Sequence, residues 1–184
     1  MIITEQVDGW IYAAHPLATP DATFGGFADA VATWRSKARD GALPRKRDFR
    51  PEDFRRWLGW VIIYEVVPQP FDLRFRLFGS NLAENLNTDN TGKLFSQAYA
   101  HVPGHTVTLR HFRTLWRQRM IGMSSGPMNW EGLAFHSGLF LDLPVADDTG
   151  ELAYYFTFAR LGDEALSAEM PLPRRPVAVL ASAL

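Results

Sequence analysis

Two adjacent apolar segments joined by prolines constrain the fold of this 184-residue chain more than any other feature. Residues 60–67 are almost entirely apolar and rich in β-branched side chains, which is typical of a strand buried on both faces. Pro68 and Pro70 interrupt the chain. Residues 71–77 then alternate apolar and charged side chains, the period of a half-buried strand. The two segments predict an antiparallel hairpin, with residues 60–67 in the interior of a sheet.

Helical periodicity appears on both sides of this hairpin. Phe27, Val31 and Trp34 recur at steps of four and three, which predicts a helix over residues 25–39. A longer helix is expected over residues 105–121, which carry Phe112 and Trp116 on one face. Short helices are expected just after Pro51 and over residues 80–86 and 93–99.

Three further strands are predicted near residues 128–133, 138–145 and 152–161. The last two are joined by a turn at residues 147–150, which end in glycine. Consecutive strands with short connections pair antiparallel. We therefore expect an α+β fold, a five-stranded antiparallel sheet with the helices on one face.

Several short motifs accompany this order of elements. They are Trp34-Arg35, residues 43–47 with Phe49-Arg50-Pro51, residues 75–82, Thr91-Gly92-Lys93, and Leu143-Pro144-Val145 before residues 147–150. Together they resemble a PAS-like family of small bacterial proteins over roughly residues 27–160. The resemblance implies a five-stranded antiparallel sheet with the first strand central, and a sensory or regulatory role.

Three segments follow from this interpretation. Residues 1–24 contain few periodic apolar positions and are expected to form an irregular lead-in. Residues 25–161 form the PAS-like sensor domain, with the 25–39 helix flanking its core. Residues 162–184 are a C-terminal extension whose prolines suggest an extended strap.

Composition and charge exclude several classes of function. The chain has no cysteine, which excludes disulfides, thiolate nucleophiles, zinc–thiolate sites and flavin photochemistry through a cysteinyl adduct. A net charge of −1 does not favour nucleic acid or an anionic membrane as a partner. The apolar runs are too short to span a bilayer, and the first residues do not resemble a signal peptide. We therefore expect a cytoplasmic protein.

No catalytic or metal-binding residues are predicted. Residues 122–126 match the G-x-S-x-G pattern of hydrolases, but the elbow requires a strand running into a helix, and here a helix precedes the motif. We interpret the motif as a glycine-bounded turn. His105 lies on the same helical face as Phe112 and Trp116, so haem ligation through it is conceivable, although nothing else supports it.

The leading hypothesis is therefore a module that binds a small ligand or a protein partner and signals through altered packing or association. Two alternatives stay open: a small enzyme that pairs His105 or His136 with an acid, and a ligand-free dimerisation scaffold. We also expect a homodimer with Phe27 or Trp34 at or beside the interface, because this apolar stripe must either pair with a second copy or fold back on its own sheet. The candidate ligand-binding residues are Tyr64, Phe75, Asn81, His105, Phe112, Trp116, Trp130 and Phe158.

Overall fold

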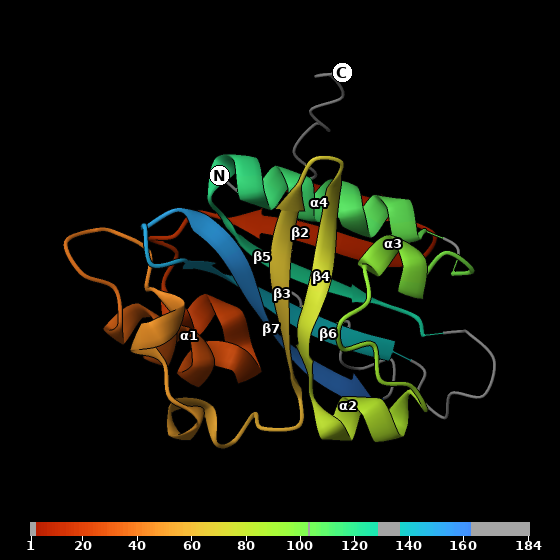
Figure 1. Cartoon of the computed structure of the whole chain (residues 1–184), viewed down its shortest axis with the longest axis horizontal. Helices are drawn as coiled ribbons and strands as arrows, with labels where there is room; N and C mark the ends of the chain where they lie inside the picture. The colour runs from red at the N-terminus through yellow and green to blue at the C-terminus, as the bar shows by residue number, and fades with distance from the viewer. Residues whose placement is uncertain (1–2, 103, 129–136, 163–184) are drawn as a thin grey trace.

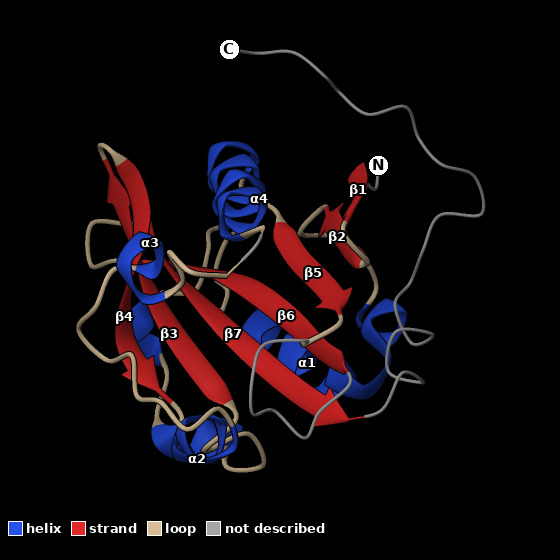
Figure 2. Ribbon diagram, turned by 90° about the vertical axis from the view of Figure 1, so that its right-hand side faces the viewer, coloured by secondary structure: helices blue, strands red, loops and turns tan. Residues whose placement is uncertain are grey.

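A computed structural model describes residues 3–102, 104–128 and 137–162, and these form one antiparallel sheet with helices on both of its faces (Figures 1 and 2). The sheet has seven strands in the order β1-β2-β5-β6-β7-β3-β4, not the five that were predicted. The strands are β1 (Ile3–Val7), β2 (Trp10–His15), β3 (Val61–Pro68), β4 (Phe71–Phe78), β5 (Ile121–Gly126), β6 (Ser137–Ala146) and β7 (Leu152–Gly162). The α-helices are α1 (Ala28–Ser36), α2 (Ser80–Asn85), α3 (Phe95–Ala98) and α4 (His105–Gln118). Short 3₁₀ helices span Asp21–Phe27, Lys46–Asp48 and Pro51–Phe54.

The hairpin predicted from the two apolar segments is confirmed. β3 pairs antiparallel with β4, and Tyr64 lies opposite Phe75 after a bulge between Ile63 and Tyr64. β3 also pairs with β7, so it lies inside the sheet and has no free edge. Its apolar sequence fits that position, since Val61, Ile62 and Tyr64 are buried.

The prediction of an irregular lead-in is wrong for residues 3–15. β1 and β2 form a second hairpin, and β2 pairs with β5, which extends the sheet by two strands. The turn is Asp8-Gly9, and both residues have positive φ angles, 51° and 80°. Asp-Gly between two short strands favours this type of two-residue turn. The dipeptide was therefore a hairpin signal that the interpretation of residues 1–24 as an irregular lead-in missed.

The third strand of the predicted five lies elsewhere. β5 covers Ile121–Gly126, the segment interpreted as a turn, whereas most of the predicted 128–133 strand lies outside the described residues. All six β5 residues are buried, and its glycines fill tight spaces. A Cβ on Gly122 would lie 2.4 Å from Leu115 Cδ1, and one on Gly126 would lie 2.3 Å from the Trp10 ring. Glycine normally weakens a strand because it has no side chain to pack. In β5 the glycines are accounted for by packing, because neighbouring side chains occupy the space where a Cβ would lie.

The helices occupy two layers, not one. α2, α3 and α4 cover one face of the sheet, whereas α1 lies behind the opposite face (Figure 2). α1 is also shorter than the predicted 25–39 helix. The preceding 3₁₀ segment contains Gly25 with φ 53° and ψ −124°, a conformation that interrupts a continuous helix.

The apolar stripe of the first helical segment packs against the chain's own sheet. Phe27 is fully buried and Trp34 is 2 % exposed. The Trp34 indole donates a hydrogen bond to the Pro144 carbonyl on β6 at 2.8 Å. The stripe therefore folds back, the other of the two expected outcomes, and it does not present Phe27 or Trp34 to a second copy.

The predicted C-terminal extension, residues 162–184, lies outside the described residues except for Gly162 at the end of β7. In the described part of the chain, no helix has the length and apolar character to cross a membrane.

Candidate functional site

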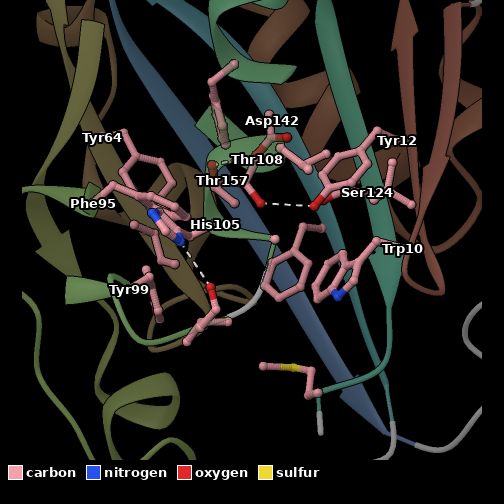
Figure 3. Close-up of a pocket in the computed structure, with 18 of the residues that line it drawn as sticks. Trp10, Tyr12, Tyr64, Phe95, Tyr99, His105, Thr108, Ser124, Asp142 and Thr157 are labelled. Atoms are coloured by element: carbon pink, nitrogen blue, oxygen red, sulfur yellow. Dashed lines mark hydrogen bonds between the residues drawn. The ribbon is translucent and has the colours of Figure 1, made fainter. Parts of the chain in front are cut away.

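A cavity of about 110 Å³ lies between α4 and the sheet face that this helix covers (Figure 3). Strands β2, β3, β5, β6 and β7 contribute to its wall, and helices α2, α3 and α4 contribute to the other side. A second, more open hollow of about 430 Å³ lies beside Trp57 and Trp60. The first cavity is the better candidate site because it is more enclosed and because it combines aromatic walls with buried polar groups.

Aromatic rings form two walls of the cavity. On the side of β2 and β6, Trp10 stacks near Tyr12 and Phe140, with ring centroids about 6 Å apart. On the other side, Tyr64 makes edge contacts with Phe95 and Phe112, and Tyr99 lies next to Phe95. Figure 3 shows Trp10 and Tyr12 opposite Tyr64, Phe95 and Tyr99.

The polar groups of the site gather between these walls. The Thr157 hydroxyl donates a 2.7 Å hydrogen bond to Asp142 Oδ1, and both residues line the cavity. Asp142 is 1 % exposed, and its Oδ2 makes no hydrogen bond to any described residue. His111 Nε2 lies 4.0 Å from that oxygen, and it is also buried without a hydrogen-bond partner in the described chain. Buried polar atoms without partners are rare, so this cluster is a specific feature of the fold.

Burial sets the protonation of this pair. It raises the pKa of Asp142 to about 7, although the hydrogen bond from Thr157 opposes the rise. Burial lowers the pKa of His111 to about 3, and the neighbouring His15 lowers it further. His111 is therefore neutral at pH 7. Its 4.0 Å separation from Asp142 is a contact between a neutral imidazole and a carboxyl group and not an ion pair.

A glycine in β5 makes room for the buried carboxyl group. A Cβ on Gly122 would lie 2.8 Å from Asp142 Oδ2, closer than carbon and oxygen normally approach. Gly122 lies opposite Asp142 in the β5–β6 ladder. The absence of a side chain at position 122 thus allows Asp142 to turn toward α4.

Three of the predicted site residues line the cavity. Tyr64, His105 and Phe112 are part of its wall, and His105 Nδ1 lies 3.0 Å from the Val102 carbonyl oxygen. Phe75 is fully buried behind the wall, where its ring contacts Tyr64. Asn81 packs against Gly59 and does not reach the cavity.

The other three predicted residues lie elsewhere. Trp116 donates a hydrogen bond to the Leu152 carbonyl and packs near Phe71, one turn of α4 away from the cavity. Phe158 points to the opposite face of the sheet, because neighbouring residues in a strand alternate and Thr157 faces the cavity. There its ring contacts the ring of Phe54. Trp130 lies outside the described residues.

Sequence reasoning missed the residues from β2 and the buried acid. Trp10 and Tyr12 were placed in an irregular segment, so they could not be assigned to a wall. Asp142 carried a usable signal, because it is the one charged residue in residues 138–145, a segment otherwise suited to burial. Acids are almost never fully buried without a specific reason.

The G-x-S-x-G motif has no elbow geometry. Ser124 lies in the middle of β5, opposite Tyr12 on β2 and Phe140 on β6, and a helix precedes the strand. A nucleophile elbow needs the reverse order, so the motif gives no reason to assign a hydrolase. Over the described residues, no group of three or more His, Asp or Glu side chains is placed to hold a metal ion.

The described chain is thus an α+β domain in which a largely aromatic cavity lies between one face of an antiparallel sheet and the helices that cover it. The sequence profile of the PAS domain family matches residues 26–124, more than half of the chain. The chain therefore belongs to the PAS domain family, and this membership indicates a sensory or regulatory module. Comparison with curated proteins and with solved structures gave no match.

Proposed function

We propose that this protein is a PAS sensor that binds a small molecule in the cavity between α4 and the sheet and signals by a change in packing. One observation carries the proposal: the cavity combines seven aromatic rings with a buried carboxyl group that has an unused acceptor oxygen. Ligand sites are typically apolar hollows with a few polar groups that orient the ligand. The rings are those of Trp10, Tyr12, Tyr64, Phe95, Tyr99, Phe112 and Phe140.

The size of the cavity restricts the ligand. Its volume of about 110 Å³ is somewhat smaller than the roughly 150 Å³ cavity that accepts benzene in an engineered protein. Sites for drug-sized ligands are several times larger, at about 300–1,000 Å³. The volume therefore favours a compact ligand of about one ring and argues against haem at His105. The absence of cysteine excludes a cysteinyl–flavin adduct.

A route for the signal follows from what touches the cavity. β2 supplies Trp10 and Tyr12 to one wall, and α4 supplies His105, Thr108 and Phe112 to the other. A ligand between them changes the spacing of the N-terminal hairpin and α4. We propose that a protein partner or a second copy of the chain detects this change. Because the stripe of Phe27 and Trp34 is buried, a homodimer would use another surface.

Native mass spectrometry and ligand titration test this proposal. The purified chain should retain a small molecule in the native spectrum, or bind single-ring compounds with NMR shift changes confined to cavity residues. Ser124→Leu adds bulk to the cavity wall and should abolish binding without unfolding the protein. Thr106→Leu, on the exposed side of α4, is the control and should bind normally. A chain that neither retains a molecule nor binds any ring compound would refute the proposal.

A further inference from the structure

We infer that the cavity selects a small organic cation, a compact amine whose ammonium group is held by Asp142 between aromatic walls. This inference rests on the proposed function and adds the chemical class of the ligand. Three features of the described residues carry it: the rings that surround the cavity, the sign of the charges that line it, and the unused oxygen of Asp142.

The walls provide the first feature. The face of an aromatic ring carries partial negative charge, so rings that surround a site attract cations, and cages of such rings recognise ammonium groups in many proteins. Here Trp10 and Tyr12 come from β2, and Tyr64 and Phe112 come from β3 and α4. Figure 3 shows Trp10 and Tyr12 on the opposite side of the space from Tyr64. A cation placed between them would contact rings on both sides.

The charges provide the second feature. Among the described residues that line the cavity, the acids are Asp142 at depth and Asp8 in the β1–β2 turn, and none is Lys or Arg. His111, beside Asp142, is neutral because burial lowers its pKa to about 3. A carboxylate ligand would therefore meet acids and no cation. The lining favours positive charge and disfavours negative charge.

The carboxyl group of Asp142 provides the third feature. Asp142 lines the cavity; its Oδ1 accepts the hydrogen bond from Thr157, whereas its Oδ2 is buried and has no hydrogen-bond partner in the described chain. An ionised carboxylate can only accept hydrogen bonds, so Oδ2 requires a donor. An ammonium group supplies both N–H donors and the counter-charge that a buried carboxylate lacks.

Without a bound cation, Asp142 is partly protonated at pH 7, because burial raises its pKa to about 7. The groups that face it are His111 from α4, Tyr12 from β2, Tyr64 from β3, and Tyr155 and Thr157 from β7. None of these supplies a positive charge at pH 7. Binding of a cation therefore favours the ionised carboxylate and displaces part of a proton per site at pH 7.

The test compares three probes of similar shape on the full chain at pH 8, where Asp142 is mostly ionised. Cyclopentylamine, a cation at this pH, and neutral cyclopentanol each have six non-hydrogen atoms, as benzene has. Cyclopentanecarboxylate is the anion. NMR titration should show the amine binding at least tenfold more tightly than the alcohol, and no binding of the carboxylate. Asp142→Asn should reduce the difference between amine and alcohol to less than twofold, whereas the exposed Asp148→Asn should preserve it.

A second measurement needs no variant. Calorimetry of the wild-type chain with cyclopentylamine at pH 7, in two buffers of different ionisation enthalpy, should detect proton release on binding. If amine and alcohol bind the wild type equally, or no proton is released, the inference of a cation is wrong and the proposed function stands. If neither the amine nor the alcohol binds the wild type, and native spectra and NMR titrations do not differ between Ser124→Leu and the wild type, both the inference and the proposed function fail.

Discussion

The hydroxyl groups of Tyr12 and Thr108 lie 2.9 Å apart, so a hydrogen bond joins the N-terminal hairpin to α4 across 96 residues of sequence. Tyr12 belongs to β2 and Thr108 to the second turn of α4, and both line the cavity. This bond directly joins the two elements that would have to move apart or together when the cavity is filled. It is therefore a sensitive position for testing how the hairpin is held.

Removing this hydrogen bond should loosen the hairpin without unfolding the domain. We expect Tyr12→Phe and Thr108→Val each to lower the free energy of unfolding by about 0.5–1.5 kcal/mol, the usual net contribution of such a bond. The double variant should cost less than the sum of the two, because both single changes remove the same interaction. Urea denaturation of all four proteins measures this coupling. Strictly additive effects would show that the hydroxyl groups do not interact.

The buried carboxyl group should make the protein less stable as the pH rises toward neutrality. Because the folded-state pKa of Asp142 is raised to about 7, the folded protein binds more protons than the unfolded chain between about pH 4 and 7. Asp142→Asn removes this contribution. The stability of the variant relative to wild type should increase by up to about 1.4 kcal/mol per pH unit over that range and level off above about pH 8.5. Denaturation at closely spaced pH values measures this difference, and a flat difference would contradict it.

His111 should have the opposite effect. Its folded-state pKa is lowered to about 3, whereas an unfolded histidine titrates near 6.5. The unfolded chain therefore binds the extra proton, and wild type should lose stability relative to His111→Phe as the pH falls from 6.5 to 4. Histidine NMR provides an independent check, because the His111 ring should stay neutral at pH 5. An imidazolium signal from His111 at that pH would contradict the prediction.

Because Trp34 is buried against its own sheet, a substitution at this position tests the stability of the fold. Trp34→Phe should lower the free energy of unfolding by about 1–3 kcal/mol, because it leaves the buried Pro144 carbonyl without its donor. Leu58→Ala, at a side chain that is 49 % exposed, is the control and should change stability by less than about 0.5 kcal/mol. Thermal unfolding of both variants measures the contrast. Equal effects would mean that the indole hydrogen bond does not stabilise the fold.

The homodimer is a separate prediction, and it is tested first on the wild-type chain. Sedimentation of the wild-type chain at micromolar concentration should show a species larger than the 20.8 kDa monomer. Trp34→Phe should not dissociate it, since Trp34 packs within its own chain. A wild type that sediments as a monomer would contradict the prediction of a dimer.

The sequence was most informative where periodicity and burial agree. β3, β4, β6 and β7 were all predicted near their observed positions, because long apolar or alternating segments identify strands that a sheet buries. β5 was missed for the opposite reason. Its glycines leave room for Trp10, Leu115 and Asp142, and of these Trp10 and Asp142 belong to other strands. Propensity alone cannot anticipate a strand whose small residues accommodate distant side chains.

The site residues also divide into those that local sequence patterns predict and those that only contacts between separate elements reveal. Helical spacing correctly placed His105 and Phe112 on one face of α4, but it also included Trp116, which packs near Phe71 beyond the cavity. The side chains of β7 could not be oriented because Tyr154 and Phe156 flank Tyr155, so both faces of the strand carry rings. Only the pairing of β7 with β3 and β6 shows that Tyr155 and Thr157 face α4.

The N-terminal hairpin has a consequence for how this protein can be compared and redesigned. Residues 26–124 match the PAS family, yet Trp10 and Tyr12, which form one wall of the cavity, precede that match. Two chains with near-identical family domains could therefore discriminate between different ligands if their leading hairpins differ. Grafting residues 3–15 between such chains would exchange part of the chemical selectivity and leave the other wall, the buried carboxyl group and the fold of the recipient unchanged.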